Sequence, residues 1–325
     1  LNIKAHQGSR KSVLEMSRIR AITLWGEQFR GVFAPAISLF LQQEENAGNR
    51  EKNIVEVHNH AGNKIGTVTL VPQASFLRNT ENIFSVNYSR KAVDILETVN
   101  NTRCTYLRDA STFFLGVVTG DNNTHILPFP EETHPDPIIV GRDLSQYRIN
   151  FSNHYFKSEA ELQQVAPRHL YHAKNKLLYR FIGKKLTFAL DREGYYMLNN
   201  VNGIIPRIDS LSVESILSLL NSRVLQYYYE KTFFTVKVLR GNIERLPLRN
   251  MSEKTQKQIE KLISSIMESN DTAECREREN LEDILFHEYG LKDAQAHHIS
   301  DYLHGTGADD DTGTNTTYRS TESSL

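Results

Sequence analysis

Apolar and polar side chains alternate most regularly in the second half of the chain. From Lys184 to Leu190, apolar residues recur at every second position, which is the period of a strand with one buried face. Asp191-Arg192-Glu193-Gly194 has the composition of a turn. We expect Tyr195–Val201 to form the returning strand. The pattern therefore predicts a hairpin over residues 184–201.

The period changes to that of a helix after Ser212. Apolar residues recur at three- and four-residue spacing as far as Tyr227, with Ser212 placed to cap the helix and Glu214 in its first turn. A polar and aromatic stretch follows from Thr232 to Asn242. Pro247 lacks an N–H and therefore ends any further strand pairing.

The N-terminal third has the pattern of a sheet. We predict strands at Ala34–Leu41 and Lys64–Val71, the second alternating along its length. Arg18–Trp25 is apolar enough for a strand or a short helix, and Glu44–Asn53 is expected to be a polar loop. Ile54–Asn59 is a further candidate strand.

The middle of the chain carries shorter signals. Phe113–Val118 and Ile138–Gly141 are predicted short strands, and Asp121-Asn122-Asn123 is a predicted turn. The proline-rich run Pro128–Pro137 is expected to be an extended connector.

The end of the chain has helical period. One helix is predicted over residues 255–267 with Ser252 as its N-cap, and Asn270-Asp271 breaks it. A second is predicted from Leu281 to Tyr289, stopped by Gly290, and a third from Ala294 to Leu303. Residues 305–325 are rich in Asp, Thr, Ser and Gly, and are predicted to be disordered.

Charge divides the chain in a way that hydropathy does not. The 325 residues carry a net charge of −1, but residues 168–248 hold thirteen Lys and Arg against six Asp and Glu, a net of +7. Residues 251–304 carry a net of −6. Basic groups interleaved with aromatics and amides suit contacts with phosphates and base edges, although a solvated basic surface gives the same composition.

Other features narrow the class of protein. The two cysteines, Cys104 and Cys275, are far apart and indicate neither a disulfide framework nor a cysteine-based zinc site, so a reducing compartment is expected. Gly31–Leu41, the most apolar early stretch, is too short to span a membrane, and no membrane partner is predicted. His58 and His60 lack further metal ligands at a fixed spacing, so no metal is predicted.

Four short motifs occur in order along the basic region and just before it. They are Gly141-Arg142-Asp143-Leu144 after a short strand; Gly183-Lys184-Lys185 running to Asp191; Asn221-Ser222 on the predicted helix; and Ile243-Glu244-Arg245-Leu246-Pro247 after the aromatic stretch. This order resembles the C-terminal specificity domain of TaqI-like adenine-N6 DNA methyltransferases, a family that includes type IIG restriction–modification enzymes. The resemblance implies recognition of a DNA target by a cytoplasmic, prokaryotic protein.

An earlier segment, Trp25–Leu41, resembles the last strands of the same family's methyltransferase domain. The family places an aromatic beside the extruded adenine, and the resemblance assigns that role to Phe29, with Phe33 as a weaker candidate. A core aromatic at a strand start is the alternative for Phe29. The family's Asn/Asp-Pro-Pro-Tyr/Phe tetrapeptide and its glycine-rich S-adenosylmethionine turn are both absent from the sequence.

These observations predict an α+β protein with four parts. Residues 1–105 would be the end of an α/β methyltransferase sheet, 106–250 a mixed α/β specificity domain, 251–304 a helical segment and 305–325 a tail. The rest of the methyltransferase region would come from the same or a separate polypeptide. S-adenosylmethionine would be the cofactor of that parent enzyme, and the chain alone would bind none and be inactive.

Double-stranded DNA is the expected partner. Phosphate contacts are predicted from Arg180, Lys184, Lys185, Lys237 and Arg240, and base or further DNA contacts from Tyr195, Asn199, Asn200, Thr235 and Asn242. No nuclease or nucleophilic-catalysis motif is visible. The alternative function is a protein-interaction subunit of a modification or defence complex, with Ser252–Leu303 as its working surface and no DNA affinity.

Overall fold

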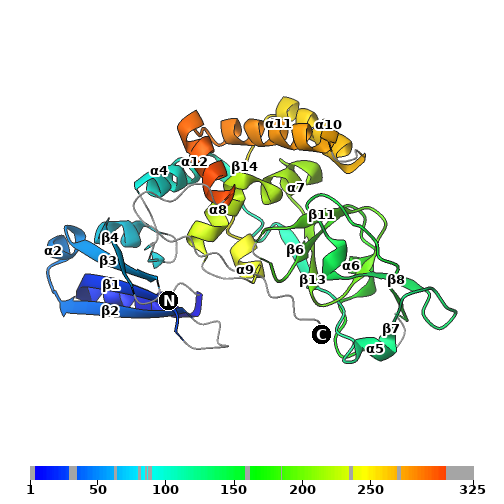
Figure 1. The fold of residues 1–325 in the computed structure, drawn as a ribbon, viewed down its shortest axis with the longest axis horizontal. Coiled ribbons are helices and arrows are strands. Elements are labelled where there is room, and N and C mark those ends of the chain that lie inside the picture. The colour runs from blue at the N-terminus through cyan, green and yellow to red at the C-terminus, as the bar shows by residue number, and fades with distance from the viewer. Residues whose placement is uncertain are drawn as a thin grey trace. The chain divides into compact units, whose positions relative to one another are not determined.

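The computed structural model describes residues 4–28, 35–61, 64–79, 82–84, 86, 90–157, 162–183, 185–233, 237–268 and 272–304 (Figure 1). They fall into two compact units. The first contains the described residues of Leu1–Ile95, Lys231–Phe234 and Ala294–Leu325, and the second those of Leu96–Glu230 and Thr235–Asp293. Each unit has its own sheet structure and its own core. None of the described helices is both long enough and apolar enough to cross a membrane.

The first unit is built on one four-stranded sheet in the order β2-β1-β3-β4. Its strands are β1 (Ser17–Glu27), β2 (Pro35–Gln43), β3 (Ile54–Ala61) and β4 (Lys64–Pro72). β1 and β3 are parallel, whereas the β1–β2 and β3–β4 pairs are antiparallel. The predicted strands at 34–41 and 64–71 are confirmed, and Arg18–Trp25 is a strand rather than a helix.

Helices α1 (Gln7–Met16), α2 (Ala47–Glu51) and α3 (Gln73–Arg78) contact this sheet. The first unit also contains the 3-10 turn η1 (Lys4–His6), the start of α4 (Arg90–Asn100) and most of α12 (Asp293–His304). The prediction of a loop over Glu44–Asn53 is wrong, because α2 forms there. Asn46 explains the difference: its side chain accepts a hydrogen bond from Asn49 N and so caps a single helical turn.

The core of the first unit lies against one face of the sheet. It is formed by the buried side chains of Leu14, Ile19, Ile22, Val55, Val57, Val71, Phe76, Phe84 and Val86. β1 has a register irregularity after Ile19, and there the buried Gln73 replaces a strand partner: its Oε1 accepts from Ile19 N at 2.9 Å. Asn53 completes the arrangement by donating to Ile19 O at 2.8 Å.

The second unit contains two four-stranded sheets and a small ribbon. One sheet has the order β11-β10-β13-β6 and is antiparallel throughout, and the other has the order β12-β8-β9-β7. The strands are β5 (Cys104–Thr105), β6 (Ser111–Leu115), β7 (Ile126–Leu127), β8 (Asp136–Ile139), β9 (Tyr155–Phe156), β10 (Lys176–Arg180), β11 (Phe188–Asp191), β12 (Tyr196–Met197), β13 (Val201–Pro206) and β14 (Leu248–Arg249), the last pairing with β5.

A buried cluster joins the two larger sheets. Phe114, Leu178, Ala189 and Val201 contribute from the first sheet, and Ile138, Phe156 and Met197 from the second. Helices complete the unit: α5 (Asn122–His125), the 3-10 turn η3 (Gly141–Asp143), α6 (Arg168–Tyr171), α7 (Val213–Asn221), α8 (Arg223–Thr232), α9 (Arg240–Ile243), α10 (Glu253–Glu268) and α11 (Thr272–Glu288). The structure is therefore a mixed α+β fold, as predicted.

The predicted hairpin over residues 184–201 is wrong in its pairing. A turn does form at Asp191–Gly194, but the strand that enters it, β11, pairs with the preceding β10. After the turn, β12 leaves for the second sheet and runs parallel to β8. The hairpin of this region is therefore β10–β11, with Gly183 and Lys185 in its loop.

The predicted helix ends are confirmed at Ser212, Ser252 and Gly290, but α11 begins at Thr272 and not near Leu281. The side chain of Ser212 accepts from Ser215 N and begins α7, and Ser252 does the same for Thr255 N at α10. Gly290 has φ +67° and ends α11, because a left-handed residue after the last turn is the usual stop of a helix. Asp121 caps the short α5 where a simple turn was expected. Residues 270–271 and 305–325 lie outside the described part of the chain.

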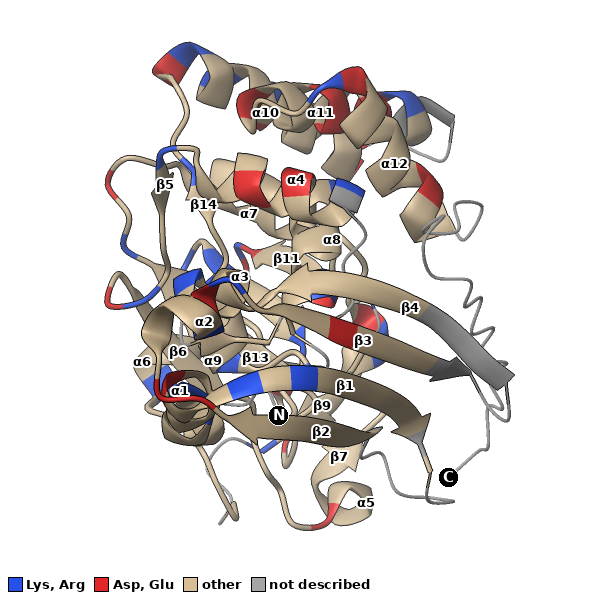
Figure 2. Cartoon of the chain, turned by 90° about the vertical axis from the view of Figure 1, so that its left-hand side faces the viewer, with Lys and Arg blue, Asp and Glu red and all other residues tan. Residues whose placement is uncertain are grey.

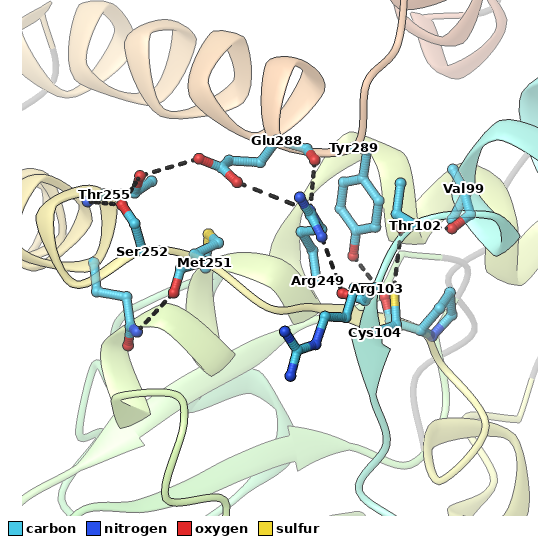
Figure 3. Close-up of polar contacts among 12 residues, drawn as sticks. Val99, Thr102, Arg103, Cys104, Arg249, Met251, Ser252, Thr255, Glu288 and Tyr289 are labelled. Atoms are coloured by element: carbon cyan, nitrogen blue, oxygen red, sulfur yellow. Dashed lines mark hydrogen bonds and ion pairs between the residues drawn. The ribbon is translucent and has the colours of Figure 1, made fainter.

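The helices α10 and α11 lie side by side and are attached to the β5–β14 ribbon (Figures 1 and 3). The guanidinium of Arg249 donates to Glu288 O at 2.7 Å and to Arg103 O at 3.1 Å. The buried Tyr289 hydroxyl donates to Pro247 O at 2.7 Å. Acidic residues are spread along both helices (Figure 2). Helices α10 and α11 are thus joined by specific contacts to the rest of the second unit.

Candidate nucleic-acid interface

The turn after β11 is organised by the carboxylate of Asp191, which is fully buried. It accepts three backbone hydrogen bonds, from Glu193 N at 2.8 Å, Gly194 N at 2.9 Å and Tyr195 N at 3.0 Å. It also forms a buried ion pair with Lys176 Nζ at 2.5 Å. Burial lowers the pKa of Lys176, and the attraction of Asp191 opposes that shift. The aspartate of the second motif is therefore a structural anchor for the loop that presents Tyr195.

The Asn-Ser motif supports the buried edge strand β11 of the same hairpin. Asn221 accepts from Phe188 N and donates to Phe188 O, both at 2.9 Å, as a neighbouring strand would. Ser222 then caps a new helix, since its hydroxyl accepts from Leu225 N at 3.1 Å. The helix predicted to run on to Tyr227 is therefore divided at Ser222 into α7 and α8.

Two amides extend this support to Leu186. Gln226 accepts from Leu186 N at 2.6 Å, and Gln146 donates to Leu186 O at 3.0 Å and to Asn221 O at 3.1 Å. The backbone of β11 and of the residues before it is thereby fixed by side chains from three separate segments. Such a hairpin can hold its loop in a constant position.

Lys237 and Arg240, two of the predicted phosphate contacts, lie beside aromatic rings. Lys237 Nζ is 5.9 Å from the ring centroid of Phe181, and the Arg240 guanidinium is 5.1 Å from that of Phe113. Both basic side chains are exposed, and the backbone of residue 237 forms a bridge to Ile182. Arg240 also pairs with Glu244 at 2.7 Å. This pairing of cations with aromatic rings favours contact with an anionic, base-bearing ligand.

Lys185 has a different environment. Partial desolvation and the positive charges of Arg278 and Arg223 lower its pKa, and Glu282 opposes them. Glu282 lies on α11, is 8% exposed, and accepts from Arg223 N at 3.1 and 3.0 Å. Burial raises the pKa of Glu282 to about 7. Lys185 therefore interacts electrostatically with the helical segment as well as with solvent.

Two of the predicted contacts are used within the fold. Asn242 is 7% exposed, donates to Tyr229 Oη at 3.2 Å and accepts from Arg245 at 3.0 Å. Arg180 is half-buried and donates to Leu144 O. Because both side chains form hydrogen bonds within the fold, we leave Asn242 and Arg180 out of the proposed interface.

The amides at 199 and 200 and the ring of Tyr195 remain accessible. Asn199 and Asn200 are exposed, and Tyr195 is half-buried with its ring 5.3 Å from that of Phe151. Asn200 accepts from Gly141 N at 3.1 Å, which places it against the Gly-Arg-Asp-Leu motif. Phe29, Phe33, Lys184 and Thr235 lie outside the described residues, so their predicted roles stay predictions.

Arg142 was not among the residues predicted to bind DNA. It is exposed, it follows Gly141 directly, and its guanidinium is 2.7 Å from His154 Nε2. The only signal in the sequence was its place in the first motif. No group of three or more potential metal-binding side chains occurs among the residues that the structure describes.

Comparison with known proteins gives the class of this region. Residues 136–248 match the family model of the TaqI-like C-terminal specificity domain. That segment begins at β8 and ends at β14, and it contains all four motifs. Residues 136–248 are therefore similar to a TaqI-like specificity domain. None of the curated proteins matches the chain.

Several solved structures of restriction–modification proteins are similar to the chain. The type IIL restriction–modification enzyme MmeI, in complex with DNA, is 9% identical over 89% of this chain and 45% of its own, with a TM-score of 0.47. The type IIG restriction endonuclease BpuSI is 10% identical over 89% of this chain and 46% of its own, with a TM-score of 0.35. The HsdS subunit from Thermoanaerobacter tengcongensis is 12% identical over 61% of this chain and 50% of its own, with a TM-score of 0.35. The chain thus spans less than half the length of MmeI or BpuSI.

Proposed function

We propose that this chain recognises a double-stranded DNA target for a restriction–modification enzyme. The observation that carries the proposal is the match of residues 136–248 to the TaqI-like specificity domain. The geometry supports it, because exposed cations at Lys237 and Arg240 stand beside aromatic rings, and exposed amides lie at Asn199 and Asn200. Cations would contact phosphates, and amides would contact base edges.

The enzyme served would be an adenine-N6 DNA methyltransferase with S-adenosylmethionine as its cofactor. The family resemblance supports this finer proposal, as does the sheet of the first unit, which would belong to the methyltransferase domain. The missing tetrapeptide and glycine-rich turn would be supplied by a methyltransferase region on the same or another polypeptide. The chain alone would then bind DNA but would not transfer a methyl group.

Fluorescence anisotropy with a labelled random-sequence duplex tests the proposal. The purified chain should bind at low salt and should weaken as salt rises, since released counterions drive phosphate contacts. Absence of binding at low salt would contradict DNA recognition and favour a protein-interaction subunit. Calorimetry with S-adenosylmethionine should detect no binding to the same preparation. One-site micromolar binding would contradict the proposal that the cofactor site belongs to a methyltransferase region outside this chain.

A further inference from the structure

Arg142 is held outward by a chain of hydrogen bonds that ends in the protein interior. Its guanidinium is 2.7 Å from Nε2 of His154, whose Nδ1 is 2.8 Å from the Ser152 hydroxyl. Ser152 in turn donates to the carboxylate of Asp143, which is 1% exposed and also accepts from Val140 N at 2.9 Å. An exposed arginine is thereby connected to a buried carboxylate through two side chains.

Each of the hydrogen bonds that connect Arg142 to Asp143 has one possible direction. A guanidinium only donates, so Nε2 of His154 must accept. The ring proton is then on Nδ1 and is donated to Ser152 Oγ, and the Ser152 hydroxyl donates to Asp143. The arrangement fixes the tautomer and orientation of His154, and through it one edge of Arg142. Four of the five guanidinium donors are left by the bond to His154.

The turn that carries Arg142 also positions an amide. Gly141 N donates to Asn200 Oδ1, and a Cβ at residue 141 would lie 3.1 Å from Asn200 Nδ2. Any larger residue at 141 would therefore displace the Asn200 amide by a few tenths of an ångström. The same turn fixes both an exposed arginine and an exposed amide, the two kinds of side chain that read purine edges in the major groove.

We propose that Arg142 is a specificity-determining residue that recognises a guanine in the DNA target, and that His154 is its positioning residue. The inference rests on the proposed DNA recognition. A phosphate contact tolerates a mobile cation, whereas bidentate recognition of guanine O6 and N7 needs a guanidinium held in one plane. Holding the side chain in advance also reduces the entropy lost on binding.

Selection of bound sequences from a randomised duplex library, with the full chain, tests this assignment. The wild-type chain should enrich a motif that contains guanine. Arg142→Ala should lose the preference at one guanine position and bind the selected site roughly ten- to a hundredfold more weakly. Arg142→Lys keeps the charge but should lose the same preference. Arg207→Ala, which removes another exposed arginine of the second unit, is the matched control and should keep the motif.

His154 is tested by two variants. His154→Ala should weaken the preference at the same guanine position. His154→Gln should restore it, since an amide can accept from Arg142 and donate to Ser152. Melting temperatures measured for all variants show whether each is folded under the conditions of the binding assay.

The outcomes separate this inference from the proposed function. If Arg142→Ala weakens all duplexes equally and leaves the motif unchanged, Arg142 contacts phosphate and the inference is overturned. The inference is also overturned if Arg142→Ala binds with the affinity and the motif of the wild-type chain. It is overturned as well if the motif that the wild-type chain selects contains no guanine. If the wild-type chain binds no duplex at all, DNA recognition itself fails, and this inference fails with it.

Discussion

Asn221 exchanges two hydrogen bonds with the backbone of Phe188, so its side chain takes the place of a strand at the edge of β11. Both residues are buried, and both bonds are 2.9 Å long. The contact joins the end of α7 to the β10–β11 hairpin. It also explains why the helix stops at this point, because Asn221 must project toward the strand while Ser222 begins the next helix.

Asn221→Ala should lower the free energy of unfolding by about 1–3 kcal/mol, because the buried N–H of Phe188 loses its partner, whereas Phe188 O keeps the hydrogen bond from Tyr147 N at 2.8 Å. Urea unfolding of the whole chain measures the change. Asn199→Ala removes an exposed amide from the same unit and should change stability by less than about 0.5 kcal/mol. Equal effects of the two substitutions would show that the contact with Phe188 contributes little.

Lys176 and Asp191 form a fully buried ion pair. Lys176→Met should destabilise the chain by about 3–5 kcal/mol, because an uncompensated carboxylate is left in the interior. Adding Asp191→Asn should recover part of this loss. Arg192→Ala breaks the partly exposed pair with Glu214 and should cost less than about 1 kcal/mol. Strict additivity of the Lys176 and Asp191 substitutions would argue against their coupling.

The sequence predicted elements whose periodicity is local. The strand β4, the cap at Ser212 and the stop at Gly290 each depend on neighbouring residues, and the structure confirms them. The partner of β12 could not be predicted in this way. Turn residues at 191–194 indicate that the chain reverses, but they do not specify which sheet the next strand joins.

For the candidate site, the sequence predicted the kinds of residue present but not the contacts between them. Apolar spacing continues across Ser222, so nothing in the period reveals the break that Asn221 imposes. The electrostatic contact of Lys185 with Glu282 was hidden, because it depends on a helix about a hundred residues further along. Arg142 is oriented by its hydrogen bond to His154, and the sequence does not reveal that the fold brings these two residues together.

Glu282 should make stability depend on pH. Burial raises its pKa in the folded chain from 4.5 to about 7, so the folded state binds a proton more tightly than the unfolded state. Its contribution is therefore fully present below pH 4.5 and is lost as the pH rises through 7, a change of up to about 3 kcal/mol. Glu282→Gln should remove this part of the decline when melting temperature is measured from pH 4.5 to 8.

A matched variant separates this effect from general charge changes. Glu260→Gln removes a carboxylate from α10 and should retain the wild-type decline. A Glu282→Gln curve parallel to wild type over the whole range would show that Glu282 does not titrate differently in the folded and unfolded states.

Lys237 and Arg240 should contribute to DNA affinity through counterion release. If each contacts one phosphate, Lys237→Ala with Arg240→Ala should reduce the log–log salt slope of duplex binding by about 1.8, which is about 0.9 for each contact. The loss should be similar for all DNA sequences, because phosphate contacts carry no direct sequence information. Lys254→Ala with Lys261→Ala removes two exposed cations from α10 and should leave the slope as in wild type. A reduced slope in the α10 variant and an unchanged one in the other would place the phosphate contacts on the helical segment instead.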